Sequence, residues 1–401
     1  MDGWSSVRAL LATYYFLASV PHSAAGTMNC DLAIRYTIGS NEPGSGDTEL
    51  NEPEGVAFDE ERGELYVADV FNHRVQVFNV DDGSLVASIV NHKTKDREKR
   101  SFTKVLYQPR GIAIDLEHER LFVSESWKRE VQVFSLRDRS FVRAIGTEGD
   151  EEGQFDNPRS LAIDSRNQRL VVADTDNDRV QSLALPMDER DNDDNHDNDD
   201  DDDGDDEDGP AVAFVAGEHG DGECEFEVPF GVAVDNKLQR VVVSDTNNHR
   251  LQVLSSNDGS FLFEFGERGT APGQLLEPSG VCIDSRSRIL VVDSCNHRLQ
   301  AFTSDGEHIS SLALPVKAPR AMALDERRGI LAFTAANQVY VINANGLLPG
   351  SFAWNLERHR FATKSVRQVV STTTMIRSLC HDNPISRLPN ELLFAIYQYL
   401  C

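Results

Sequence analysis

The sequence predicts an all-β chain that folds as a six-bladed β-propeller with four strands in each blade. The first observation is a unit of three short apolar strands joined by polar turns, which is clearest at Pro229–Leu254. The second is its recurrence in five further copies: Pro53–Asn79, Pro109–Ser135, Pro158–Leu183, Pro278–Thr303 and Pro319–Asn343. Because no single unit can bury its own apolar residues, the units must pack together, and repeats of this length and composition are typical of propellers.

A fourth, outer strand follows most of the units, at Ser84–Val90, Ser140–Ile145, Ala211–Ala216 and Ser260–Phe265. The last unit has no such strand, because Pro349 and Gly350 interrupt the segment that follows it. The segment Asp31–Gly39, which reads DLAIRYTIG, precedes the first unit and has the composition of an outer strand. We therefore expect this N-terminal strand to complete the sixth blade, since pairing both ends of the chain removes an open sheet edge.

The units share the pattern P-x-G-ϕ-A-ϕ-D … ϕ-x-V-x-D-x-x-N-x-R-ϕ-Q-V, in which ϕ is an apolar residue. An Asp that ends the second strand precedes an Arg that begins the third, in the pairs Asp69/Arg74, Asp174/Arg179, Asp245/Arg250 and Asp293/Arg298. The second unit has Glu125 and Glu130 at these offsets, and the sixth has Thr334 and no arginine. The pattern resembles the NHL repeat family of β-propellers over roughly residues 53–343. This resemblance implies a scaffold that binds ligands on one face, and it does not imply catalysis.

We expect the polar residues of the pattern to stabilise the fold and not to take part in catalysis or metal binding. A tight turn would bring each Asp and Arg together near the interface between blades, where they satisfy each other and the turn amides. His73, His249 and His297 lie inside the same motif, so we expect turn residues rather than metal ligands. The six cysteines form no C-x-x-C pair, and no nucleophile elbow, zinc-protease motif or phosphate-binding loop is present. We therefore predict no catalytic residues, no cofactor and no metal.

Three segments outside the repeats differ in composition from the expected propeller at residues 31–355. Residues 1–30 contain an apolar run, Ala9–Val20, which is too short to span a bilayer and could be a signal peptide cleaved after Ala25. Residues 188–208 hold fifteen Asp or Glu and one Arg in a chain of net charge −27. We expect this segment to be a disordered insertion in a hairpin of the third blade, and residues 356–401 to form a short helical tail.

The tail contains a phrase, L-P-x-E-L-L-x-x-I-x-x-Y-L, that is similar to the opening helix of an F-box over about fifteen residues. That helix docks on the Skp1-type adaptor of cullin ubiquitin ligases. The resemblance implies adaptor contacts from Leu388, Pro389, Leu392, Leu393, Ile396 and Leu400. The alternative is an amphipathic helix that packs against the propeller. An adaptor motif requires a cytoplasmic protein, whereas a cleaved signal peptide would make it secreted. We expect the cytoplasm.

Propeller geometry places the second-to-third strand turns and the blade-to-blade connections on the same face. The connection Asn91–Tyr107 is rich in lysine and arginine, and the turns of the first two blades carry exposed aromatic residues. Aromatic side chains beside arginines are typical of interaction hot spots. We predict that this sector binds a protein partner through Phe71, Lys93, Lys95, Arg97, Lys99, Arg100, Trp127, Lys128 and Arg129.

The favoured function is a non-catalytic protein-interaction scaffold that presents a partner on this face and is linked to ubiquitin ligation through the tail. A secreted binding protein is one alternative, if the N-terminal segment is removed. RNA binding is a second alternative, since some NHL propellers bind RNA through a basic face, although the chain as a whole is acidic. The third is a zinc-dependent propeller lyase, which would need histidines at the axis that the first strands do not supply.

Overall fold

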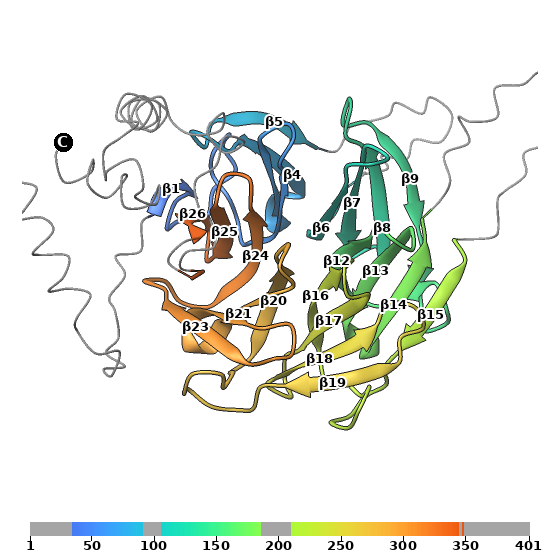
Figure 1. The fold of residues 1–401 in the computed structure, drawn as a ribbon. Coiled ribbons are helices and arrows are strands. Elements are labelled where there is room, and N and C mark those ends of the chain that lie inside the picture. Colours follow the sequence, from blue (N-terminus) through green and yellow to red (C-terminus); the bar gives the residue numbers. More distant parts are fainter. Residues whose placement is uncertain (1–33, 91–105, 186–209, 345–346, 349–401) are drawn as a thin grey trace, which may run out of the picture. The chain divides into compact units, whose positions relative to one another are not determined.

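The computed structural model describes residues 34–90, 106–185, 210–344 and 347–348, which form a ring of six four-stranded antiparallel sheets around a central axis (Figure 1). The predicted signal peptide, the acidic insertion, the basic residues 91–105 and the tail lie outside these described residues. What the sequence predicts for them stays a prediction. Within the described residues, no helix has the length and apolar character needed to cross a membrane.

In the first five blades the strands follow chain order from the axis outward. Blade 1 consists of β2 (Pro53–Asp59), β3 (Glu64–Asp69), β4 (Arg74–Asn79) and β5 (Leu85–Ile89). Blade 2 consists of β6 (Pro109–Asp115), β7 (Arg120–Glu125), β8 (Glu130–Ser135) and β9 (Phe141–Ile145). Blade 3 consists of β12 (Pro158–Asp164), β13 (Arg169–Asp174), β14 (Arg179–Ala184) and β15 (Val212–Ala216).

Blade 4 consists of β16 (Pro229–Asp235), β17 (Arg240–Asp245), β18 (Arg250–Ser255) and β19 (Phe261–Phe265). Blade 5 consists of β20 (Pro278–Ile283), β21 (Ile289–Asp293), β22 (Arg298–Phe302) and β23 (His308–Ala313). The sequence analysis did not predict the outer strand β23, which the structure shows. A short parallel pair, β10 (Thr147–Glu148) and β11 (Gln154–Phe155), precedes blade 3.

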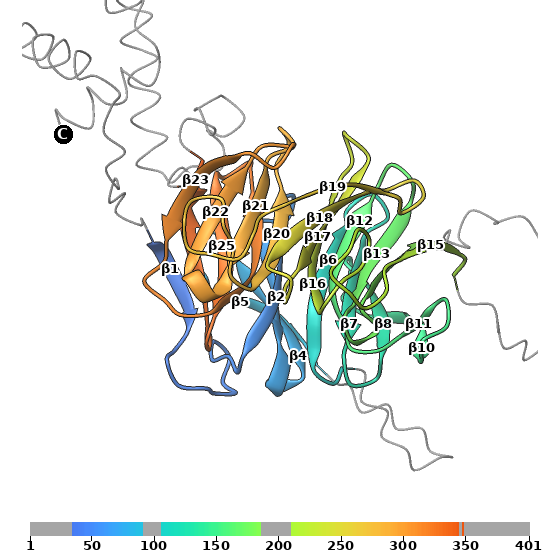
Figure 2. The same ribbon diagram turned by 90° about the horizontal axis from the view of Figure 1, so that it is seen from below.

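The sixth blade joins the two ends of the propeller. It consists of β24 (Pro319–Asp325), β25 (Ile330–Ala335), β26 (Gln338–Asn343) and β1 (Ile34–Gly39). β1 pairs antiparallel with β26, so the prediction that an N-terminal strand completes this blade is confirmed. The first strands contact one another in succession, and β24 contacts β2 to close the ring (Figures 1 and 2).

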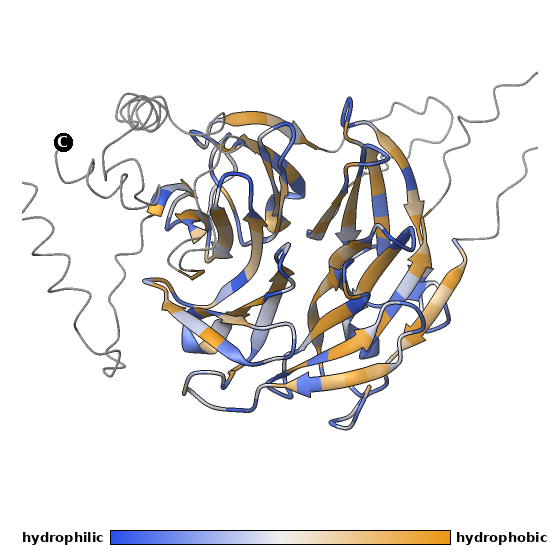
Figure 3. Cartoon of the chain, viewed as in Figure 1, coloured by the Kyte–Doolittle hydropathy of each residue, from blue (hydrophilic) through white to orange (hydrophobic). Residues whose placement is uncertain are grey.

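The hydrophobic core lies between neighbouring blades and is divided into clusters. One cluster combines Tyr66 and Val77 of blade 1 with Ile112 and Val123 of blade 2, and equivalent clusters fill the other interfaces. Figure 3 shows apolar residues along the strands and hydrophilic residues in many of the connecting turns. Each blade therefore buries one face against each neighbour, as the repeat pattern requires.

In blades 1, 3, 4 and 5 the Asp–Arg pair holds the connection that leads into its own blade. In blade 4 the buried Asp245 accepts hydrogen bonds from Arg250 Nε at 2.8 Å and from the backbone N–H of Glu227 at 2.8 Å. Arg250 also donates to the carbonyl oxygen of Glu225 at 3.1 Å. The same arrangement recurs at Asp69, Asp174 and Asp293. The predicted pairing is thus confirmed, and its partner is the backbone of the incoming connection.

The motif histidines are turn residues that also reach the next blade. His73, His249 and His297 adopt left-handed backbone conformations with φ of 55°, 57° and 54°. The Nδ1 atom of each accepts a hydrogen bond from a backbone N–H of the following connection, at 3.2, 3.1 and 3.2 Å. Among the described residues, no group of three or more His, Cys, Asp or Glu side chains could hold a metal ion.

Blade 2 departs from the Asp–Arg pattern and has no arginine beside its buried acid. Glu125 replaces the Asp, and both of its carboxylate oxygens lie within hydrogen-bonding distance of the backbone N–H of Tyr107, at 2.6 and 2.8 Å. Glu130 takes the place of the Arg and pairs with Lys128. Burial raises the pKa of Glu125 to about 8, although the hydrogen bond from Tyr107 lowers it. Glu125 is therefore mainly uncharged at neutral pH.

Blade 6 also departs from the pattern, and here the sequence alignment of the repeat was wrong by one position. The sheet register pairs Pro319 with Ala335, so Ala335 and not Thr334 occupies the place of the Asp. The hydroxyl of Thr334 instead accepts from the N–H of Ala321 at 3.1 Å and donates to the carbonyl oxygen of Glu54 at 3.0 Å. Thr334 thus links blade 6 to blade 1 across the closure of the ring.

Replacing Arg250 with Met should lower the free energy of unfolding by about 3–5 kcal/mol, because Asp245 would keep a buried charge without its counterion. Urea unfolding followed by circular dichroism measures this change. The matched control is Arg286→Met, at an exposed arginine of a blade 5 turn, with an expected change below about 0.5 kcal/mol. Equal losses in the two variants would show that the pair does not fasten the blade.

Glu125 should make the stability of the propeller depend on pH. Its folded pKa of about 8 lies above the usual value of 4.5, so the stabilisation is complete below pH 4.5 and is lost as pH rises through about 8. In Glu125→Gln the side chain cannot ionise. Between about pH 5 and about pH 9 the wild type should lose on the order of 2–4 kcal/mol of unfolding free energy relative to this variant. Stability curves that stay parallel across this range would contradict the assignment.

Candidate functional site

One face of the disc carries both the second-to-third strand turns and the starts of the first strands. The register shows this directly, because Pro53 pairs with Asp69 and Pro109 pairs with Glu125. The blade-to-blade connections therefore enter at the same edge as these turns. We call this surface, defined by residues 69–74 and 125–130 and their equivalents together with the starts of the first strands, the connection face.

An aromatic row made of His73, Tyr107 and Trp127 joins the turns of blades 1 and 2 on the connection face. The rings of His73 and Tyr107 stack with centroids 4.4 Å apart and an interplanar angle of 16°. Tyr107 and Trp127 follow at 5.6 Å and 44°. Trp127 is 68% exposed and Phe71 is 43% exposed. The structure thus links the two predicted aromatic turns through Tyr107, which the sequence analysis did not single out.

The two predicted basic residues beside Trp127 are neutralised by acids of the same chain. Lys128 Nζ lies 3.3 Å from a carboxylate oxygen of Glu130. Arg129 forms ion pairs with Glu148 and, at 3.2 Å, with Asp156. The remaining predicted basic residues, Lys93, Lys95, Arg97, Lys99 and Arg100, lie outside the described residues, as do the six predicted adaptor-binding residues of the tail. Within the described part of this sector, aromatic surface and not positive charge is the distinguishing feature.

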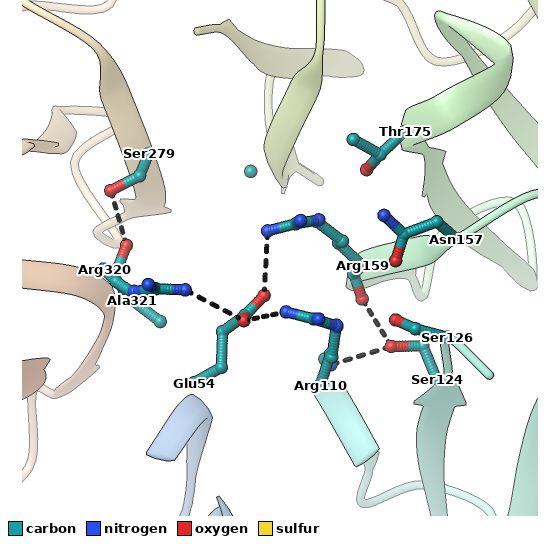
Figure 4. Close-up of polar contacts among 12 residues, drawn as sticks. Glu54, Arg110, Ser124, Ser126, Asn157, Arg159, Thr175, Ser279, Arg320 and Ala321 are labelled. Carbon is teal, nitrogen blue, oxygen red and sulfur yellow. Dashed lines mark hydrogen bonds and ion pairs between the residues drawn. The ribbon is translucent and has the colours of Figure 1, made fainter. Parts of the chain in front are cut away.

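A second group of charged residues, missed by the sequence analysis, meets at the propeller axis. Its members directly follow the proline that begins four of the first strands, and we call it the axial cluster: Glu54 of β2, Arg110 of β6, Arg159 of β12 and Arg320 of β24. Figure 4 shows the three guanidinium groups converging on Glu54 from different blades. Glu54 is 4% exposed and pairs with Arg110, with Arg159 at 3.4 Å and with Arg320 at 3.5 Å.

Side-chain hydroxyl groups hold the backbone that carries this cluster. Thr334 donates to the carbonyl oxygen of Glu54 at 3.0 Å. Ser124 donates to that of Arg159 at 2.6 Å, and Ser279 donates to that of Arg320 at 2.6 Å (Figure 4). Each hydroxyl belongs to the neighbouring blade that precedes the residue it holds. The charged side chains are therefore presented from fixed backbone positions, which favours binding by a preformed site.

The axial cluster lines a cavity of about 80 Å³ to which all six first strands contribute. Glu54, Arg110 and Arg159 form its charged part, and Phe230 lies under Arg159 with the guanidinium carbon 4.8 Å from the ring centroid. Burial lowers the pKa of Arg159 and outweighs the carboxylate of Glu54, which raises it, while the positive charges of Arg110 and Arg320 lower it further. Three guanidinium groups repel metal cations, so this chemistry favours an anion.

The signal for the axial cluster is present in the sequence but weak. The residue after the first-strand proline reads Glu, Arg, Arg, Phe, Ser and Arg in the six units, which is an unusual charge content at the start of a buried strand. This charge content becomes informative only when the starts of the six first strands are known to converge on one axis. The repeat pattern predicts the convergence, but it does not predict which side chains point inward.

Comparison with known proteins supports the repeat assignment. The NHL repeat signature matches residues 50–78, 226–254 and 275–302. The protein brain tumor of Drosophila melanogaster is 34% identical over 134 residues, which cover 32% of this chain and 13% of the fly protein. Human NHL repeat-containing protein 2 is 29% identical over 91 residues, which cover 22% of this chain and 12% of that protein. The matches thus span about an eighth of the length of these relatives.

Among solved structures, a gluconolactonase from Xanthomonas campestris superposes with a TM-score of 0.51 over 73% of this chain and 86% of that chain. Sequence identity is 15%, so the likeness shows a shared fold alone. Together with the sheet topology, these findings establish that the chain contains NHL repeats within a six-bladed β-propeller.

Proposed function

We propose that this protein is a non-catalytic scaffold whose connection face docks a protein partner, with Trp127 as the main anchor. The observation that carries the proposal is the aromatic row. Trp127 is largely exposed, yet its ring contacts Tyr107, which in turn stacks on His73. A large aromatic side chain that is ordered before binding loses little conformational entropy on contact, which is the property of an interface hot spot.

The backbone beneath the aromatic row is also well anchored. Tyr107 donates its N–H to the buried Glu125, and the adjacent N–H of Gln108 donates to His73 Nδ1 at 3.2 Å. Phe71 donates its N–H to the carbonyl oxygen of Asn51 at 3.2 Å. The rings are thus carried by backbone that is fastened from both blade 1 and blade 2. This rigidity supports recognition of a partner by a preformed surface.

A binding role also agrees better than catalysis with the chemistry at the axis. The carboxylate of Glu54 is surrounded by three arginines, which occupy its oxygen atoms with ion pairs (Figure 4). Such an arrangement offers positive charge to a ligand but no free base or nucleophile. RNA is a less favoured ligand, because Lys128 and Arg129 are paired with acids and the chain carries a net charge of −27.

Replacing Trp127 with Ala should weaken partner binding by about tenfold or more while leaving the fold intact, since the exposed ring contributes little to the core. Affinity capture with the full chain followed by mass spectrometry would identify proteins held by the wild type. Their affinities for purified wild-type and variant protein are then measured by titration.

The matched control is Leu238→Ala. Leu238 is also an exposed apolar residue, but it lies in the first-to-second strand turn of blade 4, on the opposite face. This variant should bind as the wild type does. A partner that binds Trp127→Ala with unchanged affinity, or that is lost equally with Leu238→Ala, would contradict docking on the connection face.

The proposed link to ubiquitin ligation rests only on the tail phrase, whose residues lie outside the described part of the chain. If the phrase acts as an adaptor-binding helix, the full chain should recover a Skp1-type adaptor and a version ending at Asn355 should not. Recovery of the adaptor by both versions, or by neither, would remove this part of the proposal and leave the connection face unaffected.

A further inference from the structure

The axial cluster carries more positive charge than its own carboxylate can balance. Three guanidinium groups surround the single carboxylate of Glu54, which leaves an excess of two positive charges within the cluster. No other ion pair is formed by these three arginines within the described residues. Burial already disfavours the charge on Arg159. An anion that entered the cavity would relieve this imbalance.

The cluster also holds hydrogen-bond donors that lack acceptors. Each guanidinium presents five N–H groups, whereas one carboxylate offers about four acceptor positions. The contacts with Glu54 use only one terminal nitrogen of each arginine. The buried Nε atoms of Arg110 and Arg159 have no hydrogen-bond partner among the described residues. Unsatisfied buried donors are costly, so a ligand rich in oxygen atoms would be stabilised here.

The cavity has room for one small group. Its volume of about 80 Å³ accommodates several water molecules, since one water needs roughly 10–15 Å³ of such space. Apolar residues of the first strands, such as Val56, Ile112 and Leu161, complete its wall. In these surroundings electrostatic attraction is screened less than in bulk water. A single compact anion fits this site better than an extended chain of charges.

We propose that the axial cluster is an anion-recognition site that receives one phosphorylated side chain of the partner docked on the connection face. A phosphoserine or phosphothreonine carries about −1.5 to −2 charges at neutral pH and three acceptor oxygens, which match the excess charge and the arginine forks. The inference rests on the proposed function, because the partner must dock on the same face. Tyr107 and Arg110 lie in one short segment entering β6, so both contacts can belong to one partner.

Nucleic acid fits the same observations less well. Binding of a nucleic acid backbone needs several positive charges along a track. Here the described cations beside the aromatic row, Lys128 and Arg129, are already paired with acids, so they offer no continuous track of positive charge to the axis. The acidic chain would also repel a polyanion over longer distances.

The first test measures binding of inorganic phosphate, and then of a phosphoserine peptide, to the full-length protein by calorimetry. The double variant Arg110→Gln, Arg159→Gln should weaken phosphate binding by about tenfold or more. It removes the two excess positive charges and two of the three guanidinium groups that would donate hydrogen bonds to the phosphate. Glu54→Gln should have the opposite effect and tighten binding, because the competing carboxylate is lost. A merely structural cluster would not give this change of sign.

The matched control is Arg166→Gln with Arg286→Gln, which removes the same charge from exposed arginines in first-to-second strand turns on the opposite face. It should leave phosphate binding unchanged. If the axial double variant does not fold, Arg320→Gln serves instead, because that side chain is 46% exposed, and it should weaken phosphate binding. The proposal would be overturned if the wild type did not bind phosphate, or if the control variant lost as much phosphate affinity as the axial variant.

Two further measurements separate the axial site from the docking surface and from nucleic acid. Trp127→Ala should bind inorganic phosphate as the wild type does. The docking proposal and the anion-site proposal can therefore be rejected independently of each other. A single-stranded RNA oligonucleotide is tested in parallel with the phosphoserine peptide. If RNA binds and depends on Arg110 and Arg159 while the peptide does not bind, the site recognises nucleic acid and the proposal is wrong.

Discussion

The whole propeller depends on how closely its six first strands approach one another at the axis. A β-carbon built at Gly55 would lie 2.1 Å from the carbonyl oxygen of Arg110, and one built at Gly111 would lie 1.9 Å from that of Arg159. At these two positions only glycine allows the approach without moving the next blade. The same closeness lets a hydroxyl such as that of Ser124 bridge two blades, and it brings side chains from opposite sides of the ring within reach of Glu54.

The hydrogen bonds at the second-to-third strand turns have a different role, because they hold the incoming connection against the blade that follows it. Where Asp and Arg are both present, a buried carboxylate is balanced by charge, as at Asp245 and Arg250. Blade 2 replaces that pair with Glu125, which burial keeps mainly uncharged at neutral pH, so the fastening there depends on protonation. The aromatic row includes Trp127 of this blade and Tyr107 of the connection that leads into it. The departure from the repeat pattern and the candidate docking surface thus occupy the same part of the molecule.

Strand positions, blade count and ring closure could be predicted because they follow from periodicity and turn chemistry that are local in sequence. The outer strand β23 was missed because two of its three inward-facing positions are the polar residues His308 and Ser310, whereas Ile309 is exposed. The site was only partly predictable. The exposed position of Trp127 could be predicted from its turn, but the contact with Tyr107 and the axial cluster depend on residues of different blades. Sequence alone also could not show that Arg129 is neutralised by Glu148 and Asp156, which come from the neighbouring connection.

The pairing of β1 with β26 also determines the order in which the fold can be completed. Ile34 pairs with Ile342, about three hundred residues later, so synthesis of almost the entire ring must precede this contact. Contacts of such sequence separation form slowly because they close a long loop of chain. Until then β1 has no partner strand, and blade 6 presents an unpaired edge that could join another molecule. Completion of the ring is therefore a late event, and the nascent chain is most exposed to misassembly just before it.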